Sequence, residues 1–119
     1  MQLMAKQSNF ARYNDGVANI YRDISKRTTF AAKENARTLD DLEFVCKLDF
    51  EELSKRQQDQ EFAEQNGFSL SMKIRTRLAP GLESKCKVVI GDTLYAVSYL
   101  DKTRTDAFLY LEEVRKIDS

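Results

Sequence analysis

The chain has few side chains suited to catalysis, because none of its 119 residues is a histidine. Histidine is the commonest general acid–base group, the usual partner of a serine or cysteine nucleophile, and a ligand in most catalytic zinc sites. With only four glycines, the chain also has neither a GxxxxGK[ST] phosphate loop nor a GxGxxG motif. These absences predict a protein that is not an enzyme and uses no cofactor.

The two cysteines, Cys46 and Cys86, are too few for a disulfide scaffold and have no metal-ligand spacing. We interpret both as small apolar residues of buried strands, since free cysteine is among the most buried residue types. Asp40, Asp41 and Glu43 lack the glycine and the spacing of a calcium-binding loop. The sequence therefore predicts no catalytic residue, metal site or cofactor site.

A basic strand is the clearest charged motif. Lys73, Arg75 and Arg77 alternate with uncharged residues, so all three cations fall on one face of a strand. Such a face could follow a phosphate backbone, but nucleic-acid-binding barrels usually add exposed aromatic residues for stacking. Phe68 falls on the opposite, inward register. A solvated or protein-contacting face is therefore the favoured interpretation, and nucleic-acid binding stays open as a hypothesis.

The zero net charge hides a segregation of charge along the chain. Residues 1–38 carry seven bases and three acids, residues 40–64 carry nine acids and three bases, and residues 65–104 carry seven bases and three acids. These segments are either solvated faces or parts of a polar molecule whose acidic segment meets a basic surface on a neighbour.

Length and composition predict one small domain outside the membrane. With 42% apolar and 32% charged residues in 119, the chain suits a single core and is neither disorder-prone nor membrane-like. No apolar run approaches the roughly 20 residues that span a bilayer, and the N-terminus lacks the apolar stretch of a secretory signal. We expect a protein made and used in a cytoplasm, or packed into something assembled there.

Hydrophobic periodicity predicts the strands that position these residues. The predicted strands cover residues 17–22, 43–50, 68–77, 86–90, 93–100 and 106–114. Gly91-Asp92 between two apolar runs is a strong two-residue hairpin signal. The predicted core consists of the inward residues Phe44, Leu48, Phe50, Leu70, Met72, Ile74, Val88, Ile90 and Phe108.

Residues 51–65 consist of helix formers without proline or glycine. Ser54 and Gln57 fit a capping box, and Asn66-Gly67 fits a stop. The apolar content of this segment is thin, so we expect a weakly ordered surface helix that contacts another molecule, with a flexible loop tip as the alternative. Residues 23–41 form a long polar connection that is either functional or mobile.

Together these features predict a mainly β protein, a small antiparallel β-barrel of five to six strands with one inserted helix and an N-terminal extension. Six short strands are too few to fill a sandwich, whereas closing them into a barrel removes the exposed edges. The expected organisation is an N-terminal arm over residues 1–15 and a single barrel domain over 16–119 that carries the polar insert 51–66.

Several short motifs follow one another along residues 16–114. They are a polar insert from Leu48-Asp49-Phe50 through Leu53-Ser54 to Gly67, the basic strand Lys73-Ile74-Arg75, the turn Ala79-Pro80-Gly81, the tight turn Val89-Ile90-Gly91-Asp92-Thr93-Leu94-Tyr95, and the strands Val97 to Leu100 and Phe108 to Leu111. These motifs and the order of elements resemble the head-closure, or head–tail joining (head–tail adaptor), proteins of long-tailed bacteriophages and prophages.

The resemblance implies a structural virion protein of the head–tail connector, assembled in the host cytoplasm, with no membrane partner and no small-molecule substrate. Such subunits are often monomeric in solution and form a ring with themselves, usually a dodecamer, below the portal and its adaptor connector protein. The ring closes the channel for packaged DNA and provides the surface for a tail terminator or tail-completion protein. A tail terminator or tail-completion role is the first alternative, and a small nucleic-acid-binding β-barrel the second.

The polar insert would then reach toward the channel or the neighbouring subunit. The ring or channel contact candidates are Glu51, Glu52, Lys55, Arg56, Gln57, Gln58 and Glu61, and the basic face candidates are Lys73, Arg75 and Arg77. In a DNA-filled channel the acidic lining would repel phosphate, while Lys55 and Arg56 could hold the DNA end.

Overall fold

The computed structural model describes residues 13–24 and 42–117. The elements within them are β1 (Gly16–Asp23), β2 (Leu42–Leu53), α2 (Gln57–Gln65), β3 (Met72–Arg77), β4 (Cys86–Ile90), β5 (Thr93–Lys102) and β6 (Asp106–Lys116). Residues 1–12 of the expected arm, and the expected connection from residue 25 onward, lie outside the described residues.

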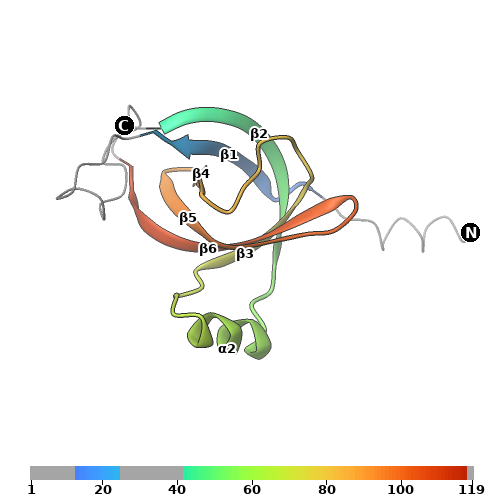
Figure 1. Ribbon diagram of the computed structural model, residues 1–119, viewed down its shortest axis with the longest axis vertical. Coiled ribbons are helices and arrows are strands. Elements are labelled where there is room, and N and C mark those ends of the chain that lie inside the picture. The colour runs from blue at the N-terminus through green and yellow to red at the C-terminus, as the bar shows by residue number, and fades with distance from the viewer. Residues whose placement is uncertain (1–12, 25–41, 118–119) are drawn as a thin grey trace, which may run out of the picture.

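The six strands close into one barrel in the order β1-β2-β3-β6-β5-β4 (Figure 1). Every neighbouring pair is antiparallel, and β1 completes the wall by pairing with β4, with Ile20 opposite Val88. The predicted fold class, a small antiparallel barrel with one helix inserted after the second strand, is confirmed.

Side chains fill the inside of the barrel. All six strands and one loop contribute to the buried cluster of Ala18, Ile20, Phe50, Ile74, Leu82, Cys86, Val88, Tyr95, Val97, Ala107, Leu109 and Leu111. Leu82 reaches this cluster from the loop between β3 and β4. Gly81 in the same loop has φ +85°, and a Cβ there would lie 2.9 Å from Val45 Cγ1, so the loop packs tightly against β2. The barrel is therefore a packed core rather than a pore.

Phe44 is wrongly placed in the predicted core. Cys46 pairs with Ile20 but Phe44 pairs with Tyr21, so Val45 is an extra residue that forms a bulge in β2. Val45 packs against the core, whereas the Phe44 side chain turns outward, is 55% exposed, and meets the edge of the Tyr21 ring at a centroid distance of 5.6 Å. A bulge shifts the alternation by one residue, which periodicity alone does not reveal.

Phe108 is the second error in the predicted core. Ala107, Leu109 and Leu111 are fully buried and point inward, so Phe108 lies on the outer face of β6. Residues 108–111 are apolar in both registers, and the pattern therefore does not decide which face is inside. The remaining predicted core positions are buried or pack partly buried against the core: Leu48, Phe50, Leu70, Met72, Ile74, Val88 and Ile90.

The predicted hairpin turn is confirmed, whereas two of the predicted strand ends differ from the observed ones. Gly91, at φ +61°, and Asp92 form the two-residue turn of the β4–β5 hairpin, in which Ile90 pairs with Thr93. β3 begins at Met72 rather than at residue 68, and β2 runs to Leu53, three residues into the expected insert.

Candidate functional site

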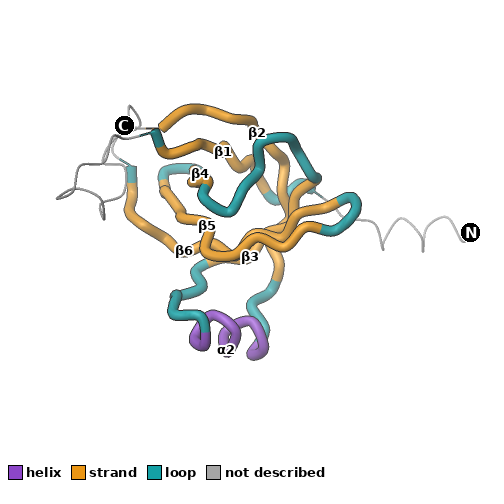
Figure 2. The backbone as a smooth tube through the Cα atoms, viewed as in Figure 1, coloured by secondary structure: helices purple, strands orange, loops and turns teal. Residues whose placement is uncertain are grey.

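α2 lies outside the barrel wall and is joined to it by a short loop at each end (Figure 2). The helix does not begin with the predicted Ser54–Gln57 capping box. Arg56 is the N-cap residue, and its backbone N–H donates a hydrogen bond to Asp59 Oδ2 at 3.0 Å. Since β2 continues to Leu53, the chain turns into the helix later than the capping pattern suggests.

Asp59 ties α2 to the barrel wall. Only 8% of this residue is exposed, and its Oδ1 accepts hydrogen bonds from Lys73 Nζ on β3 at 3.0 Å and from the Tyr110 hydroxyl on β6 at 3.4 Å. Burial raises the pKa of Asp59, but the Arg56 amide, Lys73 and the Tyr110 hydroxyl together lower it below its ordinary value. The carboxylate is therefore ionised at neutral pH and bridges the helix to two strands.

An aromatic cluster holds the same helix from a second direction. The ring of Phe62 lies 4.8 Å from Tyr99, 5.7 Å from Tyr110 and 6.2 Å from Phe68, measured between centroids. The low apolar content of the insert does not reveal this contact, because Phe62 alone supplies most of it. The signal in the sequence is the spacing of Asp59, Phe62 and Ala63, which places all three on one side of the helix.

The candidate basic face lies on the outside of β3, and its cations have partners within the chain. Lys73 pairs with Asp59, and Arg75 pairs with Glu51 on β2. The three cations Lys73, Arg75 and Arg77 also lie over aromatic rings, at 5.1 Å from Tyr110, 5.9 Å from Phe108 and 4.7 Å from Tyr13, respectively. The side chains that would have to bind a phosphate backbone are therefore already in contact with acids or aromatic rings of the chain.

Tyr13 extends this outer layer toward the β5–β6 hairpin. Its hydroxyl donates to the Asp106 carboxylate at the start of β6. Burial, followed by that hydrogen bond and the negative charge of Asp106, raises the pKa of Tyr13. The chain just before β1 is thereby fixed against the outside of the barrel.

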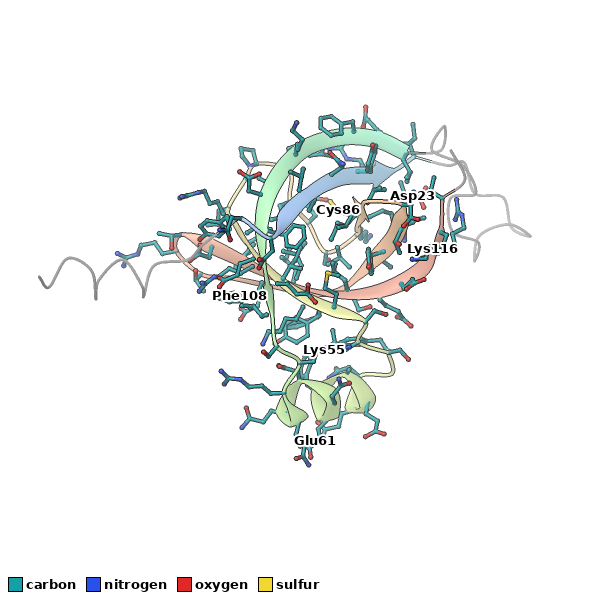
Figure 3. The ribbon with its side chains drawn as sticks, turned by 180° about the vertical axis from the view of Figure 1, so that it is seen from behind. Asp23, Lys55, Glu61, Cys86, Phe108 and Lys116 are labelled. Carbon is teal, nitrogen blue, oxygen red and sulfur yellow. The ribbon has the colours of Figure 1, made fainter. Side chains whose placement is uncertain are left out.

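Most of the insert candidates are exposed. The exposed ones are Glu52, Lys55, Arg56, Gln57, Gln58 and Glu61. Glu51 is half-buried in β2 and paired with Arg75. Lys55 Nζ donates to the Ser71 carbonyl at 3.1 Å, and in Figure 3 Lys55 lies between helix and wall while Glu61 points away from the barrel.

The described residues hold no group of three or more His, Cys, Asp or Glu side chains placed to bind a metal ion. None of the helices in this part of the chain has the length and apolar character to cross a bilayer. No protein-family model matches the sequence, and no curated protein matches it.

Proposed function

We propose that this chain is a structural subunit of the head–tail connector of a long-tailed phage or prophage. It would form a ring below the portal and its adaptor, close the DNA channel and provide the attachment surface for the tail. The observation that carries the proposal is the helix inserted between β2 and β3 of a closed barrel and held outside its wall. The family resemblance of residues 16–114 assigns ring or channel contacts to that insert.

The packed barrel limits where a DNA channel can be. Because Ile20, Ile74 and Leu109 fill the interior with no exposed surface, DNA cannot pass through one barrel, and the channel must lie between subunits of a ring. The exposed polar side of α2, with Gln57, Gln58 and Glu61, is suited to a wet subunit contact or channel lining. A carboxylate lining would repel DNA phosphate and let it slide.

The paired basic face favours this proposal over the nucleic-acid-binding alternative. A barrel that binds nucleic acid needs free cations along the backbone path and exposed rings for stacking. Here Asp59 and Glu51 already neutralise two of the three cations on β3, Lys73 and Arg75.

A nonsense mutation in the gene, placed in the phage or prophage that encodes it, tests the proposal. We expect heads that package DNA but leak it and carry no tails, together with separate, complete tails. Wild-type protein supplied from a plasmid should restore joining. A portal, a capsid protein and an adaptor should be encoded just upstream.

The same experiment separates the alternative role. Tails of abnormal length or without a terminated end would identify a tail terminator or tail-completion protein instead. Normal infectious particles from the nonsense mutant would contradict both roles. Particles should be examined by negative-stain electron microscopy, with the plasmid-complemented mutant as the control.

A further inference from the structure

We propose that the tip of the β5–β6 hairpin of one copy binds the hollow beside α2 of a second copy, so that two different surfaces of the same chain meet at each contact. This inference deepens the proposed function by naming the surfaces that would connect the ring. It rests on two surfaces of opposite charge that lie on different parts of the molecule.

The first surface is a hollow of about 350 Å³ between α2 and the segment that leads to β3. Ala63, Phe68 and Leu70 supply its apolar lining, while Glu61 and Glu64 supply carboxylates. Among the residues that the structure describes, no cation lines the hollow. The hollow can therefore receive a side chain that is apolar along its stem and positive at its end, as lysine and arginine are.

The acids of this hollow have no cationic partner among the residues that the structure describes. Within residues 13–24 and 42–117, Glu61 and Glu64 form no ion pair, and Glu61 accepts one hydrogen bond from the side-chain amide of Gln57, at 3.1 Å. Glu112 adds a third carboxylate at the edge, where it accepts the backbone N–H of Ser69 at 3.4 Å. The local field is therefore negative.

The second surface is the hairpin tip, residues 101–105, which projects past the barrel body (Figure 1). Lys102 and Arg104 are exposed and, in the described part of the chain, form no ion pair; Asp101 is the one acid in the tip. The tip holds its own shape, because the Thr103 N–H donates to the Asp106 carbonyl at 2.8 Å and the Asp106 N–H donates to Thr103 Oγ1 at 3.0 Å.

A projecting, preformed basic tip and an acidic hollow with an apolar lining complement each other in shape and charge. Because the tip costs little to order, a small contact can still bind. The two surfaces differ, so each pair of copies leaves one tip and one hollow free. Such a contact continues from copy to copy and forms a ring when the rotation closes.

Two charge-reversed variants of the full-length chain test this contact. In one the hollow is reversed (Glu61→Lys with Glu64→Lys), and in the other the tip is reversed (Lys102→Glu with Arg104→Glu). Each variant should repel its own copies, whereas an equal mixture pairs positive with negative at every contact. Glu83→Lys is the matched control, because Glu83 is an exposed acid in the loop between β3 and β4, outside both the hollow and the tip.

Sedimentation velocity at low salt provides the first readout. We expect the wild type and the control to associate weakly with rising concentration, each variant alone to associate at least tenfold more weakly, and the mixture to regain wild-type association. Association should also weaken when salt shortens the screening length from about 30 Å to about 8 Å. Circular dichroism checks that each variant is folded.

Carbodiimide cross-linking at high protein concentration provides the second readout. An amide between Lys102 and Glu61 or Glu64, found between isotope-labelled and unlabelled copies, is the expected product. No such cross-link in the wild type, or a mixture that associates no better than its components, would overturn the contact. The particle experiment above is independent: joined heads without the cross-link reject this contact alone, and the cross-link without a head–tail defect rejects the connector role alone.

Discussion

Asp59 combines two roles that are usually separate. It accepts the backbone N–H of Arg56 at the start of α2, and it forms an ion pair with Lys73 on the wall of the barrel. A carboxylate in the first turn also interacts favourably with the helix dipole. One side chain thereby stabilises both the helix and its attachment.

We expect Asp59→Asn to lower the free energy of unfolding by about 1–3 kcal/mol at pH 7, because Lys73 is left without its charged partner in a half-buried site. Urea denaturation of both proteins measures the difference. Gln58→Asn, on the exposed side of the same helix, is the control and should change stability little.

The pH dependence of that difference has a definite sign. The pKa of Asp59 is lowered in the folded protein, so its contribution is complete above the unfolded pKa of about 3.9 and is lost as the pH falls through the folded value. Wild type and Asp59→Asn should therefore converge in stability as the pH falls below about 4. A difference that stays constant down to pH 2 would show that the carboxylate charge is irrelevant.

Ile74 and Phe44 should respond differently to truncation. Ile74 has no exposed surface in the barrel core, and Ile74→Ala should cost on the order of 2–5 kcal/mol. Phe44 is 55% exposed, so Phe44→Ala should cost less than about 1.5 kcal/mol, chiefly through its contact with Tyr21. Denaturant unfolding of both variants checks the prediction, and equal losses would contradict the outward position of Phe44.

These two residues also show what periodicity can predict. Ile74 lies in a strand that alternates without interruption, and its inward position follows from the sequence. Phe44 alternates equally well with its neighbours, yet the bulge at Val45 reverses its side. The bulge depends on how β2 fits around a curved wall, which is a property of the closed barrel rather than of the strand.

At the scale of elements, the separation between barrel and helix has a measurable consequence. The core cluster contains no residue of α2. We therefore expect the barrel to stay folded when residues 54–64 are replaced by a short Gly/Ser linker. Loss of the Phe62 and Asp59 contacts should lower stability by roughly 2–5 kcal/mol. Circular dichroism and a cooperative urea transition measure this.

A barrel that unfolds in the linker variant would make α2 a necessary part of the core. Phe62→Ala separates the contribution of the aromatic contact from that of the helix as a whole, because it removes the Phe62 ring and keeps the chain length. If this variant alone reproduces the full loss, the rings rather than the helix as a whole hold the element.

For the candidate site, the helix itself can be predicted from the sequence, but its contacts with the barrel cannot. Composition predicts a surface helix within residues 51–65, and α2 occupies Gln57–Gln65 of that segment. It does not predict the docking, because Lys73, Tyr99 and Tyr110 come from strands that only the barrel topology brings to the helix. For the same reason, the alternation of residues 73–77 predicts that the cations share one face of a strand but does not predict the partners of Lys73 and Arg75.

At the scale of the molecule, the pairing of charges predicts weak binding to nucleic acid. We expect a dissociation constant no tighter than about 10⁻⁴ M for duplex or single-stranded DNA at physiological salt. Fluorescence anisotropy with labelled oligonucleotides measures it. Micromolar affinity that Arg77→Glu abolishes would restore the nucleic-acid-binding alternative.

The strand order of the barrel has a consequence for synthesis. β6 is the last of the six strands in sequence but lies between β3 and β5 in the barrel wall. Its residue Leu109 pairs with Ile74 of β3 on one side and with Leu100 of β5 on the other. Until residues 106–116 leave the ribosomal tunnel, the nascent chain can form only an open sheet whose two edges face the same gap. A ribosome that stops before β6 therefore releases a product that can accept a strand from another nascent chain, and such products would aggregate unless they are degraded.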